Sequence, residues 1–198
     1  MSNAGGMATV TRYTDMLAGN TTWNPWSPDG AFDALATVTV GATAVPSITF
    51  TGIPNTYKHL QIRCISRESL GTTIGGMYIQ LNSDTGSNYA WHRVWGDGAS
   101  ASAGASTSTT AQLGGIIATT SGTANIFSSA IIDILDYANT SKNKTMRSLT
   151  GLDYNGSGYV GLHSGLWMNT SAITSITINP DTSQNWQQHS QFTLYGVK

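Results

Sequence analysis

The side chains best suited to nucleophilic chemistry are one cysteine and one serine in a glycine-flanked run. Cys64 lies in a predicted strand whose apolar and polar residues alternate, and it shares the apolar face with Leu60 and Ile62. A reactive thiol needs solvent access and a neighbouring base, so this pattern indicates an inert core cysteine. Ser164 lies in residues 161–165, Gly-Leu-His-Ser-Gly, whose order differs from the Gly-x-Ser-x-Gly turn of serine hydrolases. Nucleophilic catalysis is therefore not predicted.

Metal ligation is the second kind of chemistry that the sequence could support. The histidines are scattered along the chain at His59, His92, His163 and His189, with no spacing that pairs ligands. Residues 82–88 place Asn, Asp, Gly and Asn at alternate positions, as a calcium loop does, but they lack the closing glutamate and enough charged ligands. A hairpin turn explains this segment better. We therefore expect no metal and no cofactor.

Paired carboxylates, which a glycoside hydrolase requires, are the third possibility. The chain has ten acidic residues, and Glu68 is its single glutamate. Asp133 and Asp136 fit the outward face and the end of a strand, and Asp153 lies in a turn. Because no acidic pair stands out by spacing, we predict that the protein is not an enzyme.

Aromatic side chains are the remaining candidates for binding. Alternation places Trp91, Arg93 and Trp95 on one face of a strand. That face suits either a sandwich core, which needs large side chains, or a surface that stacks on sugar rings. Trp186 lies in a run of Ser, Gln and Asn, so we predict an exposed contact role for it. Trp95 and Trp186 are the candidate residues for contact with a glycan or a protein partner.

The composition excludes several function classes. Charged residues make up 10% of the 198 residues, and the net charge of −1 offers no bulk attraction to nucleic acid. No apolar run approaches the ~20 residues of a membrane-spanning helix, and the N-terminus lacks the pattern of a signal peptide. A single cysteine excludes a disulfide framework. A weakly charged surface suits packing into an assembly, because few charges lose their hydration on association.

The pattern of the chain predicts an all-β fold. Residues 37–198 contain about ten or eleven strand-like runs separated by turn residues, which is typical of a sandwich or jelly roll. We therefore predict a jelly-roll-like antiparallel β-sandwich over 37–198, with less than about a tenth of it in helix. Residues 96–110 are small and polar and are predicted to form a long exposed loop.

Residues 1–36 form a separate region in this prediction, an extended N-terminal arm. The prolines fix extended backbone there, and the tryptophans must bury against the body or against a neighbour. The arm residues predicted to contact a partner are Trp23, Pro25, Trp26 and Pro28.

Four segments resemble motifs of a set of small bacteriophage-encoded virion proteins. They are residues 47–63 (SITFTGIPNTYKHLQIR), 81–89 (LNSDTGSNY), 165–178 (GLWMNTSAITSITI) and 192–198 (FTLYGVK). The resemblance covers roughly residues 45–198 and part of the arm. Its motifs are structural, so the resemblance carries over no active-site residues.

The resemblance implies a virion structural protein, made in the bacterial host cytoplasm and located on the virion surface. We expect a capsid decoration or cement protein that bridges neighbouring capsid subunits through its arm. The alternative is the receptor-binding tip of a tail or head fibre that recognises host glycan. Neither heptads nor repeats for a fibre shaft are present, which favours decoration. The expected partners are a major capsid, fibre or tail protein and further copies of this chain, as in a trimer.

Overall fold

The computed structural model describes residues 31–198, which contain strands and no helix. Trp23, Pro25, Trp26 and Pro28 lie outside the described residues. The strands are β1 (Phe32–Thr39), β2 (Ile48–Phe50), β3 (His59–Glu68), β4 (Ile74–Leu81), β5 (Tyr89–Gly96), β6 (Ala101–Thr109), β7 (Gln112–Thr119), β8 (Ser128–Leu135), β9 (Lys144–Asp153), β10 (Gly158–Trp167), β11 (Ile176–Asn179) and β12 (Gln191–Val197).

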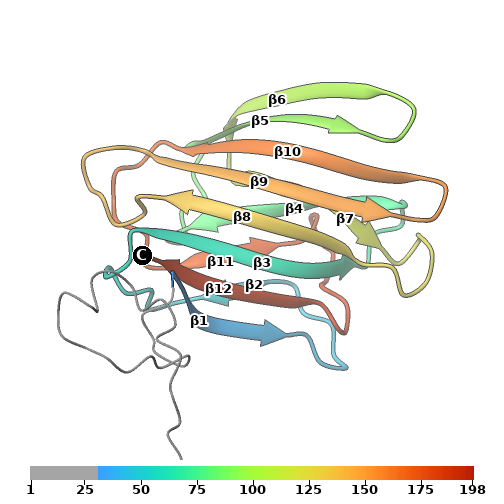
Figure 1. Ribbon diagram of the computed structural model, residues 1–198, viewed down its shortest axis with the longest axis horizontal. Helices are drawn as coiled ribbons and strands as arrows, with labels where there is room; N and C mark the ends of the chain where they lie inside the picture. The colour runs from blue at the N-terminus through green and yellow to red at the C-terminus, as the bar shows by residue number, and fades with distance from the viewer. Residues whose placement is uncertain (1–30) are drawn as a thin grey trace, which may run out of the picture. The chain divides into compact units, whose positions relative to one another are not determined.

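These strands form one continuous sheet that folds over itself into two layers. The larger layer has the order β6-β5-β10-β9-β8-β3-β12-β1, and β2, β11, β4 and β7 lie behind it (Figure 1). The layers join where β3 and β7 run parallel, with Glu68 paired to Thr119. Every other strand pair is antiparallel. The all-β prediction is confirmed, whereas the jelly-roll connectivity stays a prediction.

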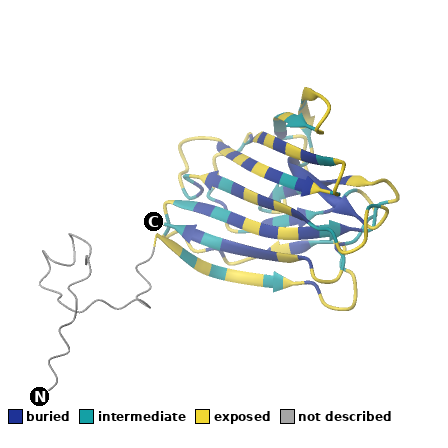
Figure 2. Cartoon of the chain, turned by 45° about the vertical axis from the view of Figure 1, so that its right-hand side comes forward, coloured by how far each residue is buried: buried dark blue, intermediate teal, exposed yellow. Residues whose placement is uncertain are grey.

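Alternation of side chains along the strands produces the core. Buried and exposed residues alternate along β8, β9 and β10, so one face of the larger layer packs inward and the other faces solvent (Figure 2). The predicted inward set, Leu60, Ile62 and Cys64, is buried as expected. Each large aliphatic side chain buried in this way contributes about 1.5–3 kcal/mol relative to exposure.

Strand β7 is buried at all of its positions because its glycines let it approach the larger layer closely. Ser148 Oγ donates a hydrogen bond of 2.6 Å to the carbonyl oxygen of Gly114. A methyl group on Gly115 would lie 2.3 Å from Cγ2 of Thr150. Glycine at this position therefore sets the separation of the layers.

Three local predictions are wrong. Residues 101–109 form strand β6 and are not an exposed loop, because their backbone pairs with β5. The first strand begins at Phe32, earlier than residue 37, because Phe32 pairs with Val197 at the end of β12. Residues 82–88 form a turn but not a hairpin, since β4 and β5 pair with different strands and belong to different layers.

The close approach of β7 predicts a specific packing defect. Gly115→Ala should lower the free energy of unfolding by about 1–3 kcal/mol, the usual cost of overpacking a core. Adding Thr150→Ser removes the clashing methyl group and should recover part of that loss. Gly41→Ala is the control, because no heavy atom lies within 4 Å of a methyl group there. Equal urea midpoints for Gly115→Ala and the control would contradict this account of β7.

Candidate functional site

The outer face of the larger layer carries a row of exposed aliphatic side chains. Ile131 pairs with Leu149, Leu149 with Leu162, and Leu162 with Val94, across β8, β9, β10 and β5. These side chains are 46–55% exposed. Directly opposed residues have Cβ atoms about 5 Å apart, so the four form one continuous strip. We call Ile131, Leu149, Leu162 and Val94 the outer apolar row.

Further features around the outer apolar row suit it to contact with another protein. Ile65 and Val160 are also exposed and lie one row along the same face. A shallow hollow of about 250 Å³ is lined by three members of the row together with Asp133, Arg147 and Ser148. Contiguous exposed apolar patches larger than about a few hundred Å² are uncommon on soluble monomers and mark interaction sites.

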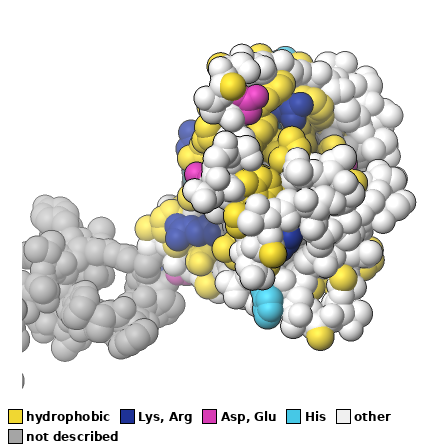
Figure 3. All heavy atoms as spheres, turned by 90° about the vertical axis from the view of Figure 1, so that its right-hand side faces the viewer, with side chains coloured by type: hydrophobic (Ala, Val, Ile, Leu, Met, Phe, Trp, Pro, Cys, Tyr) yellow, Lys and Arg dark blue, Asp and Glu magenta, His cyan; other side chains and the backbone are white. Residues whose placement is uncertain are grey.

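The polar residues beside the row are matched to one another. Asp133 Oδ1 accepts a hydrogen bond of 2.8 Å from Gln61 Nε2, and its Oδ2 accepts one of 3.1 Å from Arg147 Nε. Arg63 Nε donates to Gln61 Oε1 at 2.7 Å. Figure 3 shows a neighbouring side of the described body, on which the acidic and basic side chains form small separate groups among hydrophobic side chains and white atoms of the backbone and other side chains. A partner therefore meets little unmatched charge.

Trp186 does not have the exposed contact role predicted for it. Its side chain is fully buried, its Nε1 donates to the carbonyl oxygen of Ile178 at 3.1 Å, and its ring centroid lies 4.9 Å from that of Phe192. Its backbone also bridges Val45 and Glu68. The prediction is wrong because polar neighbours in the sequence do not determine the burial of Trp186 itself, and its indole packs into the core.

Trp95 is half-buried and packs within the protein. Its ring lies 6.4 Å from that of Tyr159 in a stacked arrangement, and the Arg93 guanidinium lies 4.2 Å from its centroid. The same guanidinium lies 5.6 Å from the Trp91 ring, so Trp91, Arg93 and Trp95 share one face as predicted. A contact of Trp95 with glycan or partner stays a prediction.

A groove of about 770 Å³ lies beside Trp91. Its lining comes from Tyr78 and Gln80 of β4, Asn179 of β11, the turn between β6 and β7, and residues 180–184. Tyr78 and Asn179 are directly paired across β4 and β11. The sequence could not indicate this groove, because its residues come from separate strands and loops that share no local motif.

One wall of the groove is attached to a buried carboxyl group. Glu68 Oε2 accepts a hydrogen bond of 2.7 Å from the backbone N–H of Asp181, whose own Oδ2 accepts one of 2.8 Å from the N–H of Gly76. Glu68 is fully buried, and a methyl group on Gly75 would overlap its Oε1. Burial raises the pKa of Glu68 to about 7, and the nearby Asp181 charge acts in the same direction.

Two residues that the sequence raised as candidates for chemistry, Cys64 and His163, are both buried. Cys64 is buried, which confirms its predicted place in the core, and burial raises its thiol pKa to about 12. Burial and the Arg93 charge lower the pKa of His163 to about 4, so its ring is neutral at pH 7. Within residues 31–198, no three His, Cys, Asp or Glu residues come together as metal ligands, and no helix is present that could cross a membrane.

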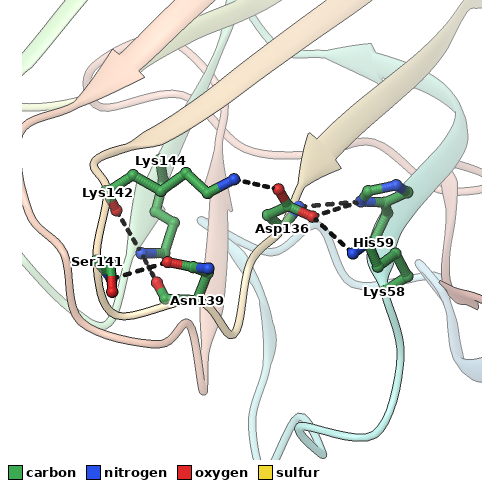
Figure 4. Close-up of polar contacts among 7 residues, drawn as sticks. All are labelled: Lys58, His59, Asp136, Asn139, Ser141, Lys142 and Lys144. Carbon is green, nitrogen blue, oxygen red and sulfur yellow. Dashed lines mark hydrogen bonds and ion pairs between the residues drawn. The ribbon is translucent and has the colours of Figure 1, made fainter.

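A cluster of charges at the end of β8 serves the fold (Figure 4). Lys144 is buried, and its Nζ donates to the carbonyl oxygens of Asn139 (2.6 Å), Lys142 (3.0 Å) and Thr170 (2.8 Å). Desolvation lowers the pKa of Lys144. Asp136 accepts a hydrogen bond from Lys142, and the backbone N–H of Asp136 donates to His59 Nδ1 at 3.0 Å. These charges fix the loop between β8 and β9.

The raised pKa of Glu68 predicts a pH-dependent stability. Because the folded pKa of Glu68, about 7, exceeds the ordinary glutamate value of 4.5, the contribution of Glu68 to stability is fully present below pH 4.5 and is lost as the pH rises through 7. Glu68→Gln should remove this fall, with a gain over the unmodified protein of at most about 3 kcal/mol at pH 9 and none near pH 4. Urea unfolding across this range measures the difference. Parallel pH profiles for the two proteins would show that Glu68 does not titrate in this way.

Comparison with protein-family models, curated proteins and solved structures finds no match to this chain. What the protein does is therefore inferred from its surfaces and from the resemblance of its motifs. Among residues 31–198, the outer apolar row and the groove beside Trp91 are the surfaces on which the functional inference rests.

Proposed function

We propose that the protein is a non-enzymatic structural component of a bacteriophage virion and that it assembles through the outer apolar row. The observation that carries this proposal is the row itself, in which Ile131, Leu149, Leu162 and Val94 are directly opposed and half-exposed. Covering apolar surface gains about 25 cal/mol per Å². The matched polar residues beside the row add little desolvation cost.

A capsid decoration or cement protein is the form of this function that we favour. In this proposal the two layers are a jelly-roll-like sandwich, an architecture that recurs in viral capsids. The arm, whose Trp23 and Trp26 lie outside the described residues, inserts between neighbouring capsid subunits at the virion surface. The low charge of the chain and its four virion-like segments support this assignment.

A receptor-binding fibre tip is the second candidate. The burial of Trp186 removes one of the two aromatic residues on which that candidate depended. The groove beside Trp91 is the observation that still favours it. A tip would expose the groove to the host cell, whereas a decoration protein needs only the outer apolar row and the arm.

Incorporation into particles tests the role of the row. Leu149→Asp places a charge in the centre of the row and should lower the copy number per particle at least about tenfold, because the charge must be desolvated on assembly. Thr145→Asp is the matched control, since Thr145 is exposed on the same face of β9 but lies outside the row. Mass spectrometry of purified particles gives the copy numbers. Equal incorporation of the two variants, or absence of the unmodified protein from particles, would contradict the proposal.

Truncation tests the role of the arm. Removing residues 1–30 keeps β1 and all described strands, so the far-ultraviolet dichroism spectrum of the body should be unchanged. Incorporation should fall by at least about tenfold if the arm anchors the protein. A truncated protein that decorates particles at full occupancy would show that the arm is not the anchor.

A further inference from the structure

We propose that the groove beside Trp91 binds a neutral saccharide. This inference is independent of the proposed assembly role, because Trp91 and Val94 of the outer apolar row occupy opposite faces of β5. The volume of about 770 Å³ lies within the range of small-ligand sites. The residues that carry the argument are Tyr78, Gln80, Trp91, Asn179, Asp181 and Gln184.

The aromatic part of the groove is Trp91. Its side chain is half-buried, so part of the indole remains accessible beside the groove. The pairing of Trp91 with Ser106 of β6 and the Arg93 guanidinium 5.6 Å from the ring hold it in place. Sugar rings present C–H faces, and an indole held in place offers the flat apolar surface on which they stack.

Two amide side chains that line the groove have orientations fixed by hydrogen bonds. Gln80 Nε2 donates to the carbonyl oxygen of Thr110 at 3.0 Å, and Asn179 Nδ2 donates to Gln80 Oε1 at 3.2 Å. An amide group has two donor hydrogens and two acceptor lone pairs, so these contacts orient the groups without exhausting their capacity. Oriented amides suit the paired hydroxyl groups of a sugar and reduce the entropy lost on binding.

The lining residues that follow β11 are also held by hydrogen bonds. Asp181 Oδ2 accepts a hydrogen bond from the N–H of Gly76, and the N–H of Asp181 donates to the buried Glu68. Ser69 Oγ donates to Gln184 Oε1 at 2.9 Å and accepts from the N–H of Asn185 at 3.0 Å. These parts of the lining are therefore held in place by contacts within the protein itself.

The charge of the lining selects the class of ligand. Asp181 is the sole charged residue among those that line the groove in the described part of the chain. No lysine or arginine lines the groove, and the Arg93 guanidinium nearby lies against the rings of Trp91 and Trp95, so a phosphate, sulfate or carboxylate on the ligand would meet the Asp181 carboxylate without a cation in the lining. Hydroxyl and amide side chains also make the groove too polar for a lipid chain. A ligand with many hydroxyl groups and no charge fits these constraints.

Nuclear magnetic resonance titration of the full chain tests the proposal. The probes are neutral tetrasaccharides of glucose, galactose, mannose and N-acetylglucosamine, and a sialylated tetrasaccharide serves as the anionic comparison. At least one neutral probe should shift the Trp91 indole N–H resonance saturably at millimolar concentration. The anionic probe should shift it less. No saturable shift with any neutral probe, or stronger binding of the anionic probe, would overturn the proposal.

Variants distinguish groove binding from adventitious contact. Trp91→Ala should weaken binding about tenfold, since it removes the stacking surface. Asn179→Ala removes an amide group from the lining without changing an aromatic residue and should also weaken binding, which covers the case in which Trp91→Ala fails to fold. His92→Ala is the control, because His92 is exposed on the opposite face of β5. For Asn179→Ala and His92→Ala the readout is the shift of the Trp91 indole N–H resonance. Unchanged affinity in Asn179→Ala, or equal losses in Asn179→Ala and the control, would contradict the proposed site.

Discussion

The buried carboxyl group of Glu68 is the constraint on which the arrangement of the two layers depends. It lies where β3 and β7 run parallel, the one place at which the described sheet passes from one layer to the other. A carboxyl group there needs a donor, and the backbone N–H of Asp181 supplies it at 2.7 Å. It also needs space, which Gly75 provides by having no side chain. The junction between β3 and β7 therefore holds Asp181, which is far from Glu68 in the sequence.

The hydrogen bond from Asp181 to Glu68 holds the polar segment 180–184 against the body of the protein. Trp186 fills the core just after the anchored Asp181, and its indole donates to Ile178 while its ring meets Phe192. Residues 180–184 line the groove. The outer apolar row lies on the solvent-facing side of the larger layer. The proposed assembly surface and the proposed ligand groove lie on opposite faces of β5, so the two proposed roles are compatible.

Alternation along single strands predicted much of the core but not the site. It placed Leu60, Ile62 and Cys64 correctly, because inward and outward positions follow from the pleat of one strand. It missed β6, whose small polar residues have no apolar period and whose order comes from pairing with β5. It also missed the groove and the burial of Trp186, since both arise from contacts between distant segments. Pairing between strands is a tertiary property that the local pattern does not contain.

Native-state hydrogen exchange in residues 180–187 tests most directly whether this segment belongs to the core. The N–H of Asp181 donates to Glu68, and the N–H of Trp186 donates to the carbonyl oxygen of Val45 at 2.8 Å. Both amides should exchange as slowly as those of β3 and β12, because they open only when the core opens. Exchange as fast as that of the exposed turn at residues 97–100 would contradict the attachment of this segment to the buried Glu68.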